Sequence, residues 1–463
     1  MGKKPVTRAA LLGALCLPIL PALAQDGGGP LLTFGISQRF ETGDNLNLEI
    51  PSEGSTTRAD TELSFGLLSE TQTDRLALDM SGLFRIENTS LTGSDAGFQD
   101  PNLRFSYDRE GATSSFNAQA YYRESDVNNL QSLTDFVDSS GNVVLPPDFA
   151  NLSGTGRRTV SGSSVNLELG RETPLGFVLD AGFSQTDYST TSSSDLSDFD
   201  RRNVDGQARL RFSPLTTGTV GLRYDTYDAA NPTGRDRTTT AADIGVEEAL
   251  SERSTLKASL GASQVETDEA GLITTTSGLI GSLGLAYDMP NGSATADFDA
   301  KLDENGDQRL EFVVGRSMEL PDGSLSARLG LTAPEIGKTE VIGGLDWQRA
   351  LPDGKISARL NRSVSSSDQD VSRLTTLASI NYDHDINAVS GIGLGLLYVQ
   401  QEGTPSDNQV TRTDLNATYR HALTEDWNVN TGVSYRVRDE DTVGRAESPS
   451  VFLSIGRRFD FRP

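Results

Sequence analysis

The sequence predicts an all-β fold: a large antiparallel up-and-down transmembrane β-barrel of about 22 strands, within a range of about 18–24. Three observations lead to this fold class. Apolar and polar residues alternate with period two from Leu32 to the last residues, as in strands with one apolar face. The connections between these segments alternate between tight and long. After residue 24, no apolar run approaches the length of about 18 residues that a transmembrane helix needs.

A repeated hairpin carries the clearest alternation. The stretches "ELPDGSLSARLGL" at 319–331 and "ALPDGKISARLNR" at 350–362 start about 31 residues apart, and "DMPNGSATADFDA" at 288–300 precedes them by the same interval. Pro, Asp or Asn, and Gly in each copy supply the backbone geometry of a tight turn. After the turn, Leu325 and Ala327 alternate with Ser326 and Arg328. Each copy is therefore predicted to form a β-hairpin.

The same alternation marks the other predicted strands. Strands are expected at 31–41, 58–69, 75–87, 101–109, 114–124, 160–170, 176–186, 202–213, 218–228, 239–249, 254–265, 273–289, 293–302, 308–319, 324–332, 340–350, 355–364, 371–382, 388–401, 410–422, 426–437 and 448–461. Tight connections include 70–74, 109–113, 171–175, 250–253, 289–292, 320–323, 351–354 and 423–425, and long ones include 42–57, 88–100, 125–159, 187–201, 229–238 and 438–447. A rim of short turns opposite a rim of long polar loops is typical of membrane-spanning barrels.

The first 24 residues have the features of a cleaved signal peptide. Lys3, Lys4 and Arg8 precede an apolar stretch, and Ala22-Leu23-Ala24 fits a cleavage site. We therefore predict two regions, a signal peptide at 1–24 and a transmembrane β-barrel at 25–463. Removal of the signal peptide takes the formal charge from −25 to −28 and removes the only cysteine. Such an acidic chain argues against a nucleic-acid partner, because phosphate binding needs clustered cations.

The C-terminal stretch "SPSVFLSIGRRFDF" resembles the insertion signal of bacterial outer-membrane barrels. Val451, Leu453 and Ile455 occupy alternate positions, and Phe459 and Phe461 close the strand. The whole mature chain is similar to Gram-negative outer-membrane β-barrel proteins of the porin-like class. This resemblance implies a location in the outer membrane. It also implies contacts with outer-membrane lipid and lipopolysaccharide, and with the barrel-assembly machinery during insertion.

A barrel turns its apolar face to lipid and its polar face to the lumen. The alternation therefore predicts lumen-lining residues, and the main candidates are Arg104, Arg123, Arg209, Arg211, Arg328, Arg359, Arg412, Asp414, Arg420, Asp297 and Asp299. Two interpretations remain open. These interleaved acids and bases either solvate and cross-link the inner wall, or they set the ion preference of a channel.

An open barrel of this width would leak, because barrels of about 16–18 strands already leave an aqueous channel. Only about six residues separate the predicted cleavage site from the first strand, so we expect no plug domain. The connection 125–159 contains an apolar group that would be unusual in a fully solvated loop. We therefore expect it to fold inward as a constriction, through Phe136, Val143, Leu145 and Phe149. The alternatives are a partner protein that fills the lumen, or a smaller strand number.

The sequence predicts neither an enzyme nor a bound cofactor or metal. His384 and His421 are the only histidines, and no metal-ligand spacing links them. A lipid-facing Ser–His pair would suit a barrel lipase, but no serine partner for His421 can be nominated from the sequence. The stretch Asp303-x-Asn305-x-Asp307 resembles the start of a calcium loop, but Gln308 and Val314 replace the glycine and glutamate that such a loop needs.

The sequence favours a porin-like channel for passive diffusion of small hydrophilic solutes. One alternative is a barrel that exports or assembles a surface polysaccharide or protein. Another is a structural barrel whose long loops bind surface ligands.

Overall fold

The computed structural model describes residues 29–91, 93–127, 133–136, 143–146, 148–149, 152, 155–191, 196–230, 235–366, 372–403, 409–441 and 443–463. The predicted signal peptide at 1–24 lies outside these residues. The strands are β1 (Leu31–Asp44), β2 (Ser55–Glu70), β3 (Asp74–Thr89), β4 (Gly93–Glu110), β5 (Ser114–Asp126), β6 (Arg157–Leu169), β7 (Leu175–Ser189), β8 (Phe199–Arg211), β9 (Thr216–Ala229), β10 (Arg235–Ser251), β11 (Ser254–Glu269), β12 (Leu272–Met289), β13 (Gly292–Leu302), β14 (Gln308–Leu320), β15 (Gly323–Pro334), β16 (Glu340–Leu351), β17 (Gly354–Ser366), β18 (Ser372–Asn387), β19 (Ser390–Gly403), β20 (Gln409–Ala422), β21 (Trp427–Glu440) and β22 (Gly444–Phe461). A short 3-10 helix, η2 (Leu133–Phe136), lies between β5 and β6.

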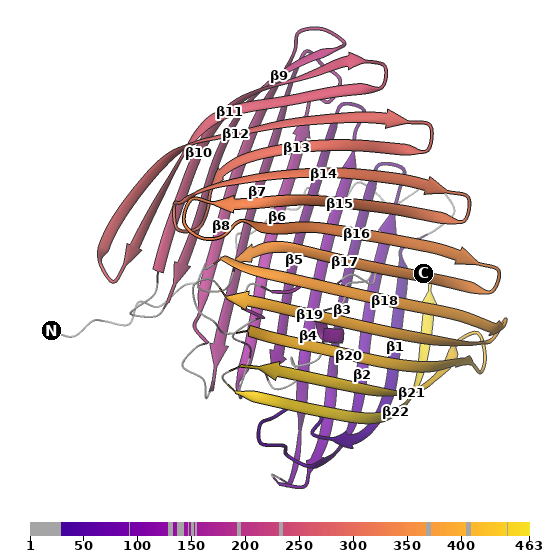
Figure 1. Cartoon of the computed structure of the whole chain (residues 1–463). Coiled ribbons are helices and arrows are strands. Elements are labelled where there is room, and N and C mark those ends of the chain that lie inside the picture. The colour runs from indigo at the N-terminus through magenta and orange to yellow at the C-terminus, as the bar shows by residue number, and fades with distance from the viewer. Residues whose placement is uncertain are drawn as a thin grey trace.

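These strands form one closed antiparallel barrel (Figure 1). Each strand pairs with its neighbours in the chain, and β1 pairs with β22 over the range from Leu32 to Gly43. Closure leaves no edge strand with unpaired backbone groups. The predicted all-β class and the predicted number of 22 strands are both confirmed. Within the described residues, no separate plug domain is present. No helix in that part of the chain is both long enough and apolar enough to cross a membrane.

The outer wall is apolar, as the alternation predicts. Phe40 on β1 lies opposite Leu453 on β22, and both side chains are about half exposed. Leu279 on β12 is 69% exposed. Phe34 packs its ring against Phe65 of the next strand, with 5.2 Å between the ring centroids. Apolar side chains presented in this way around a closed sheet suit a lipid environment.

Two connections that the sequence predicts to be long are mostly strand. β4 already begins at Gly93, and β22 begins at Gly444. Both glycines have positive φ, +83° and +110°, which lets the chain reverse in a tight hairpin. The predictions for 88–100 and 438–447 are therefore wrong, because polar strand residues above the lipid zone have the composition of loops.

A β-bulge explains why the start of β4 is hard to predict. The register shifts between Ser81 and Leu83, and Asp100 on β4 has a positive φ of 51°. Pro101 follows directly and has no N–H to donate to the ladder. The Asp-Pro step is typical of a break between elements, but here it lies inside a bulged strand.

Candidate functional site: the barrel lumen

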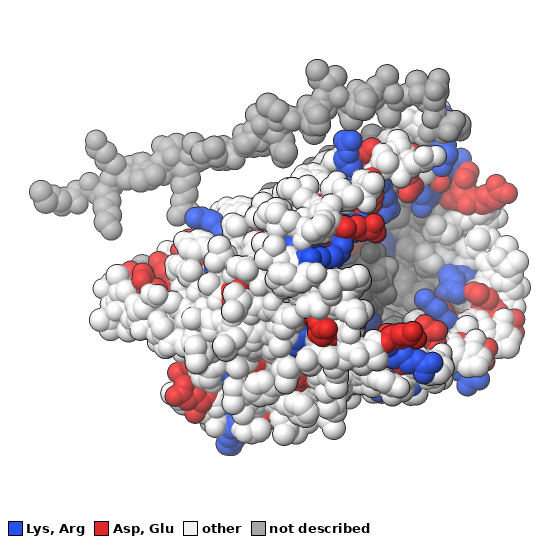
Figure 2. Space-filling model, turned by 90° about the horizontal axis from the view of Figure 1, so that it is seen from above, with Lys and Arg blue, Asp and Glu red and all other residues white. Residues whose placement is uncertain are grey.

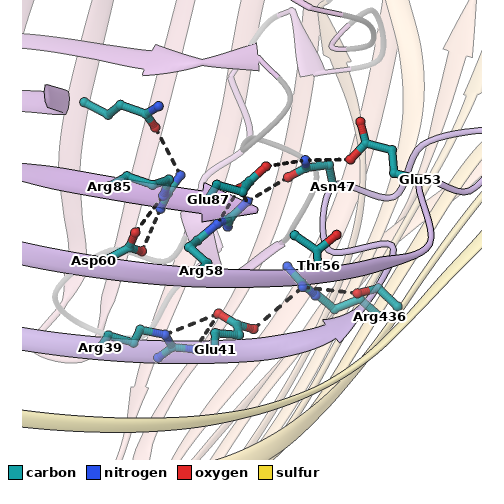
Figure 3. Close-up of polar contacts among 12 residues, drawn as sticks. Arg39, Glu41, Asn47, Glu53, Thr56, Arg58, Asp60, Arg85, Glu87 and Arg436 are labelled. Carbon is teal, nitrogen blue, oxygen red and sulfur yellow. Dashed lines mark hydrogen bonds and ion pairs between the residues drawn. The ribbon is translucent and has the colours of Figure 1, made fainter. Parts of the chain in front are cut away.

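The inner wall of β2 and β3 carries buried ion pairs (Figure 3). Arg85 binds Asp60 through two bonds, from Nε to Oδ1 at 2.8 Å and from Nη2 to Oδ2 at 2.9 Å. Arg58 donates from Nε to Glu87 Oε2 at 2.7 Å. Each pair joins residues directly opposite in the strand register. Both arginines are buried, so solvent screens these pairs little.

A second group of charged residues spans the seam between β1 and β22, where the barrel closes. Glu41 on β1 accepts a bond from Arg39 Nη2 at 3.1 Å and lies 3.8 Å from Arg436 Nη2 on β21. Ser450 on β22 donates from Oγ to Glu41 Oε1 at 2.8 Å. One carboxylate therefore ties the first strand to the last two.

The connection 45–54 folds back over this end of the barrel and buries two apolar side chains. Leu46 and Leu48 are almost fully buried. The Asn45 side chain holds the bend, because its Nδ2 donates to Glu49 O at 2.9 Å and its Oδ1 accepts from Glu49 N at 3.0 Å. Asn45 has a positive φ of 50°, a conformation that asparagine tolerates better than most residues.

Asn47 joins this connection to the ion pairs of the inner wall (Figure 3). Its Nδ2 donates to Glu53 Oε2 at 3.1 Å and to Glu87 Oε1 at 3.2 Å. Its Oδ1 accepts from Arg58 Nη2 at 2.8 Å. The connection 45–54 and the walls of β2 and β3 therefore share one hydrogen-bond network.

Glu49 makes this connection sensitive to pH. Burial raises the pKa of its carboxyl above the ordinary value of 4.5, as does the neighbouring Glu53, while Arg438 acts in the opposite sense. A raised folded-state pKa means that the folded chain binds the proton more tightly, so stability increases as pH falls through that pKa.

We expect Glu49→Gln to be more stable than wild type at about pH 7. The difference should shrink as the pH falls toward the ordinary value of 4.5, because the raised pKa makes folded wild-type Glu49 take up its proton before that pH is reached. Urea unfolding in detergent measures the free energy of unfolding of wild type and variant at each pH. An equal difference at both pH values would contradict this role of Glu49.

The connection between β5 and β6 packs an apolar cluster against the inner wall. Leu377 on β18 and Leu397 and Val399 on β19 lie on the luminal face, opposite to the apolar outer positions of the same strands. The cluster consists of Val127, Leu133, Phe136, Phe149, Leu152, Leu196, Leu377, Leu397 and Val399, with Val143, Leu145 and Tyr188 packed against it. The structure therefore brings all four predicted constriction-loop residues, Phe136, Val143, Leu145 and Phe149, to one cluster inside the barrel.

Two charged residues of β20, Asp414 and Arg412, hydrogen-bond to the backbone of this segment. Arg412 also lies over the ring of Phe149. Asp414 Oδ2 accepts from the Leu133 N–H at 2.6 Å. Arg412 donates from Nη2 to Leu152 O at 3.1 Å, and its guanidinium carbon lies 4.4 Å from the centroid of the Phe149 ring. Arg412 is fully buried. A desolvated cation over an aromatic ring contributes about 2 kcal/mol, so this contact helps to hold the segment against the wall.

A third contact holds the other side of the segment. Asp148 accepts from Nε and Nη2 of the Arg158 guanidinium and from the Tyr188 hydroxyl. Arg158 begins the luminal face of β6, and Tyr188 lies on β7. Asp148 and Arg158 are both buried. The segment is thus attached to β6 and β7 on one side and to β20 on the other.

A cavity of about 1090 Å³ remains along the inner wall from β6 to β14. Its charged lining residues are Glu168, Arg171, Arg209, Arg211, Arg223, Asp243, Glu247, Lys257, Asp299, Lys301 and Glu311. Several of them pair with each other, as in Arg209–Glu168 at 2.7 Å and Lys257–Glu247 at 3.2 Å. Figure 2 shows a hollow at one side of the molecule whose rim carries both acidic and basic side chains.

The predicted luminal residues occupy different parts of this wall. Arg209, Arg211 and Asp299 line the cavity, and Arg412 and Asp414 lie under the inward segment. Other members make separate contacts: Arg328 with Asn361, Arg359 with Asp346, and Arg420 with Asp383 and Asp385. Arg104, Arg123 and Asp297 lie opposite Tyr121, Asn102 and Gly284 in the register.

The predicted insertion signal lies at the end of β22. Phe459 pairs with Phe34, and Phe461 pairs with Leu32 on β1. Both phenylalanines are exposed on the outer wall. The Arg457 guanidinium carbon lies 4.3 Å from the centroid of the Phe459 ring. The last strand thus presents Phe459 and Phe461 outward, beside the first strand of the barrel.

The lumen-lining candidates named from the sequence do not include the buried ion pairs of β2 and β3. Arg58 and Asp60 alternate with Ala59 and Thr61, so the period-two rule used for the later strands identifies them as luminal. The inward fold of 45–54 has a weaker signal, because Leu46 and Leu48 are two of only a few apolar residues in a polar connection.

Two other patterns in the sequence have structural explanations. Ser390 Oγ lies 3.2 Å from His421 Nδ1, but it also lies 3.1 Å from Asn387 Oδ1, which caps the turn. A serine that donates its proton to an amide oxygen is not activated by the histidine. Asp303 accepts from the backbone N–H groups of Asn305 and Asp307 within its own turn. The described residues contain no cluster of three or more potential metal ligands.

Comparisons with known proteins show that the fold resembles those of solved structures. No family model matches the chain, and no curated protein matches it. The FrpB iron transporter from Neisseria meningitidis (F5-1 variant) aligns with a TM-score of 0.57 at 10% identity, covering 94% of this chain and 83% of that one. The ferric-catecholate import receptor Fiu from E. coli K12 gives 0.58 at 10% identity, with 94% and 82% covered. A point mutant of the ferric enterobactin receptor PfeA from Pseudomonas aeruginosa gives 0.54 at 11% identity, with 94% and 81% covered. The chain therefore has a 22-strand barrel like the barrels of these receptors, at distant sequence similarity.

Proposed function

We propose that the protein is a porin-like channel of the outer membrane, through which small hydrophilic solutes diffuse passively. The observation that carries this proposal is the charged cavity of about 1090 Å³ along β6 to β14, inside a wall that is apolar on its outside. A polar path within a closed apolar barrel is what a diffusion channel requires.

The inward segment is the constriction in this proposal. Its apolar cluster fills the lumen beside β18 and β19, and Arg412 and Asp414 hold it there. The cavity lies along other strands, so solute would pass beside the segment. The occupied lumen weighs against export of a wide polymer, which needs an open cross-section.

The environment of the barrel follows from the same proposal. The exposed apolar side chains of the outer wall contact lipid, and lipopolysaccharide surrounds the barrel at the rim of long connections. The barrel-assembly machinery would recognise the last strand, with Phe459 and Phe461 facing outward. The predicted signal peptide would direct the chain across the inner membrane.

Planar-bilayer recording tests the proposal. We expect discrete current steps from the purified protein, and a decrease in current when neutral polymers small enough to enter the cavity are added. Larger polymers should leave the current unchanged, which reports the width of the path. A folded barrel that inserts without conducting would contradict the channel and favour the structural alternative, in which the long connections bind surface ligands.

A further inference from the structure

One row of the inner wall runs from a cation to a carboxylate across six strands. The strand registers place these residues side by side in the order Arg209, Thr219, Gly245, Ser259, Ser282 and Asp299, on β8 to β13. All of them except Gly245 line the cavity. The row therefore crosses the floor of the proposed path.

The middle of the row consists of small polar residues. Thr219, Ser259 and Ser282 carry hydroxyl groups, and Gly245 has no side chain. Ser259 Oγ and Ser282 Oγ lie 2.7 Å apart. Small side chains leave room above the wall, and hydroxyl groups can both donate and accept hydrogen bonds. Such a floor suits a ligand with alternating donors and acceptors, as a peptide backbone has.

The first end of the row has an excess of positive charge. Arg209 Nη1 lies 2.7 Å from Glu168 Oε1, and Arg171 Nε lies 3.1 Å from Glu168 Oε2. Arg211 donates to the backbone oxygen of Arg171. Arg209 and Arg171 thus share one carboxylate inside the cavity, and Arg211 adds a third cation beside them. The other partner of Arg171, Glu110, is largely exposed.

The second end has an excess of negative charge. Asp299 lies opposite Glu311 in the register, and Asp297 is two positions away on the same face of β13. Lys301 pairs with Glu311 at 3.3 Å. Among the described residues, no ion pair within 4.0 Å is formed by Asp299 or Asp297. Asp243 on β10 adds a carboxylate to the cavity between the two ends, whereas Glu247 and Lys257 compensate each other.

The separation of the ends sets the length of a ligand that reaches both. Neighbouring strands lie about 4.8 Å apart, so Arg209 and Asp299 are about 24 Å apart along the wall. The wall of a closed barrel is concave toward the lumen, so a ligand that lies inside it spans a shorter path than the wall itself. An extended peptide spans at most about 3.5 Å per residue, so roughly four to six residues bridge it.

We propose that this row binds short linear peptides with free termini. The carboxylate of the peptide lies at Arg209 and Arg211, its ammonium group lies at Asp299, and its backbone lies over Thr219, Ser259 and Ser282. This inference rests on the proposed channel for its biological role, since it names the solute class that the path retains. The binding itself does not require that the channel conducts.

Pentaglycine is the probe, because it has free termini and no side chains. We expect it to interrupt the current through single channels and to release heat in calorimetry with the detergent-solubilised barrel. Pentaglycine that is acetylated at its N-terminus and amidated at its C-terminus should do neither at the same concentration. Loss of one charge-assisted contact should weaken binding about tenfold.

Two substitutions test whether each end of the row binds one terminus of the peptide. Asp299→Asn should weaken binding of the free peptide about tenfold, and Arg209→Gln should do the same. Asp346→Asn is the matched control: it removes a luminal carboxylate on β16, outside the row, and should leave binding unchanged. Equal binding of free and capped pentaglycine, or no heat with either peptide, would overturn the proposal. Heat from a barrel that carries no current would support the peptide site and contradict the channel.

Discussion

Deletion of residues 130–155 is expected to raise the single-channel conductance several-fold. This segment carries Leu133, Phe136, Phe149 and Leu152, which pack inside the barrel against β18 and β19. Conductance grows with the open cross-section of the lumen, and a barrel of this strand number is wide without internal filling. The measurement is current through single channels in a planar bilayer, before and after the deletion.

A point substitution distinguishes the effect of losing one contact of the segment from the effect of deleting the segment. Asp414→Ala removes the acceptor of the Leu133 N–H and should give frequent transitions to a higher conductance. Asp383→Ala is the matched control, because Asp383 is also a paired luminal carboxylate but contacts Arg420 instead. An unchanged conductance after the deletion would show that the segment does not restrict the path.

Removal of the Asp60 carboxylate is expected to have the largest effect on stability. Asp60→Ala leaves the buried Arg85 without its bidentate partner, and an uncompensated buried charge costs about 3–5 kcal/mol. Asp205→Ala is the matched control, because Asp205 pairs with Arg223 Nε at 2.6 Å but the Arg223 side chain is 65% exposed. Removal of such an exposed pair should cost no more than about 1 kcal/mol.

Urea unfolding in detergent compares these two variants. The double variant Asp60→Leu/Arg85→Met should recover much of the loss, because it removes both charges together. Equal stability of Asp60→Ala and Asp205→Ala would mean that water reaches the Arg85 pair and screens it.

Most of the fold can be predicted from the sequence because a barrel repeats one local rule. Each strand needs only its own alternation, and neighbours in the chain are neighbours in the sheet. The hairpins that begin at Pro321-Asp322-Gly323 and Pro352-Asp353-Gly354 illustrate this, since turn chemistry and alternation agree there. The rule fails at Asp100-Pro101, where a bulge keeps the strand intact through a sequence that is typical of a break.

The contents of the lumen are harder to predict, because they depend on contacts between distant parts of the chain. Leu377, Leu397 and Val399 occupy luminal positions although they are apolar. They are buried by a segment more than two hundred residues earlier, as the contact of Leu133 with Asp414 illustrates. The apolar residues of 125–159 indicate that this segment is buried, but the part of the wall that receives it is visible only in the structure.

The most direct test of the whole account is the accessibility of single cysteines along β12. The mature chain has no cysteine of its own, since Cys16 lies in the predicted signal peptide. We expect Ser282→Cys to react with a water-soluble thiol reagent in lipid vesicles, because it lines the cavity. Leu279→Cys and Leu283→Cys should be protected and should respond to a lipid-bound quencher once labelled, because they lie on the outer wall. Equal reactivity at all three positions would contradict a barrel that turns its apolar residues to lipid and its polar residues to a water-filled lumen.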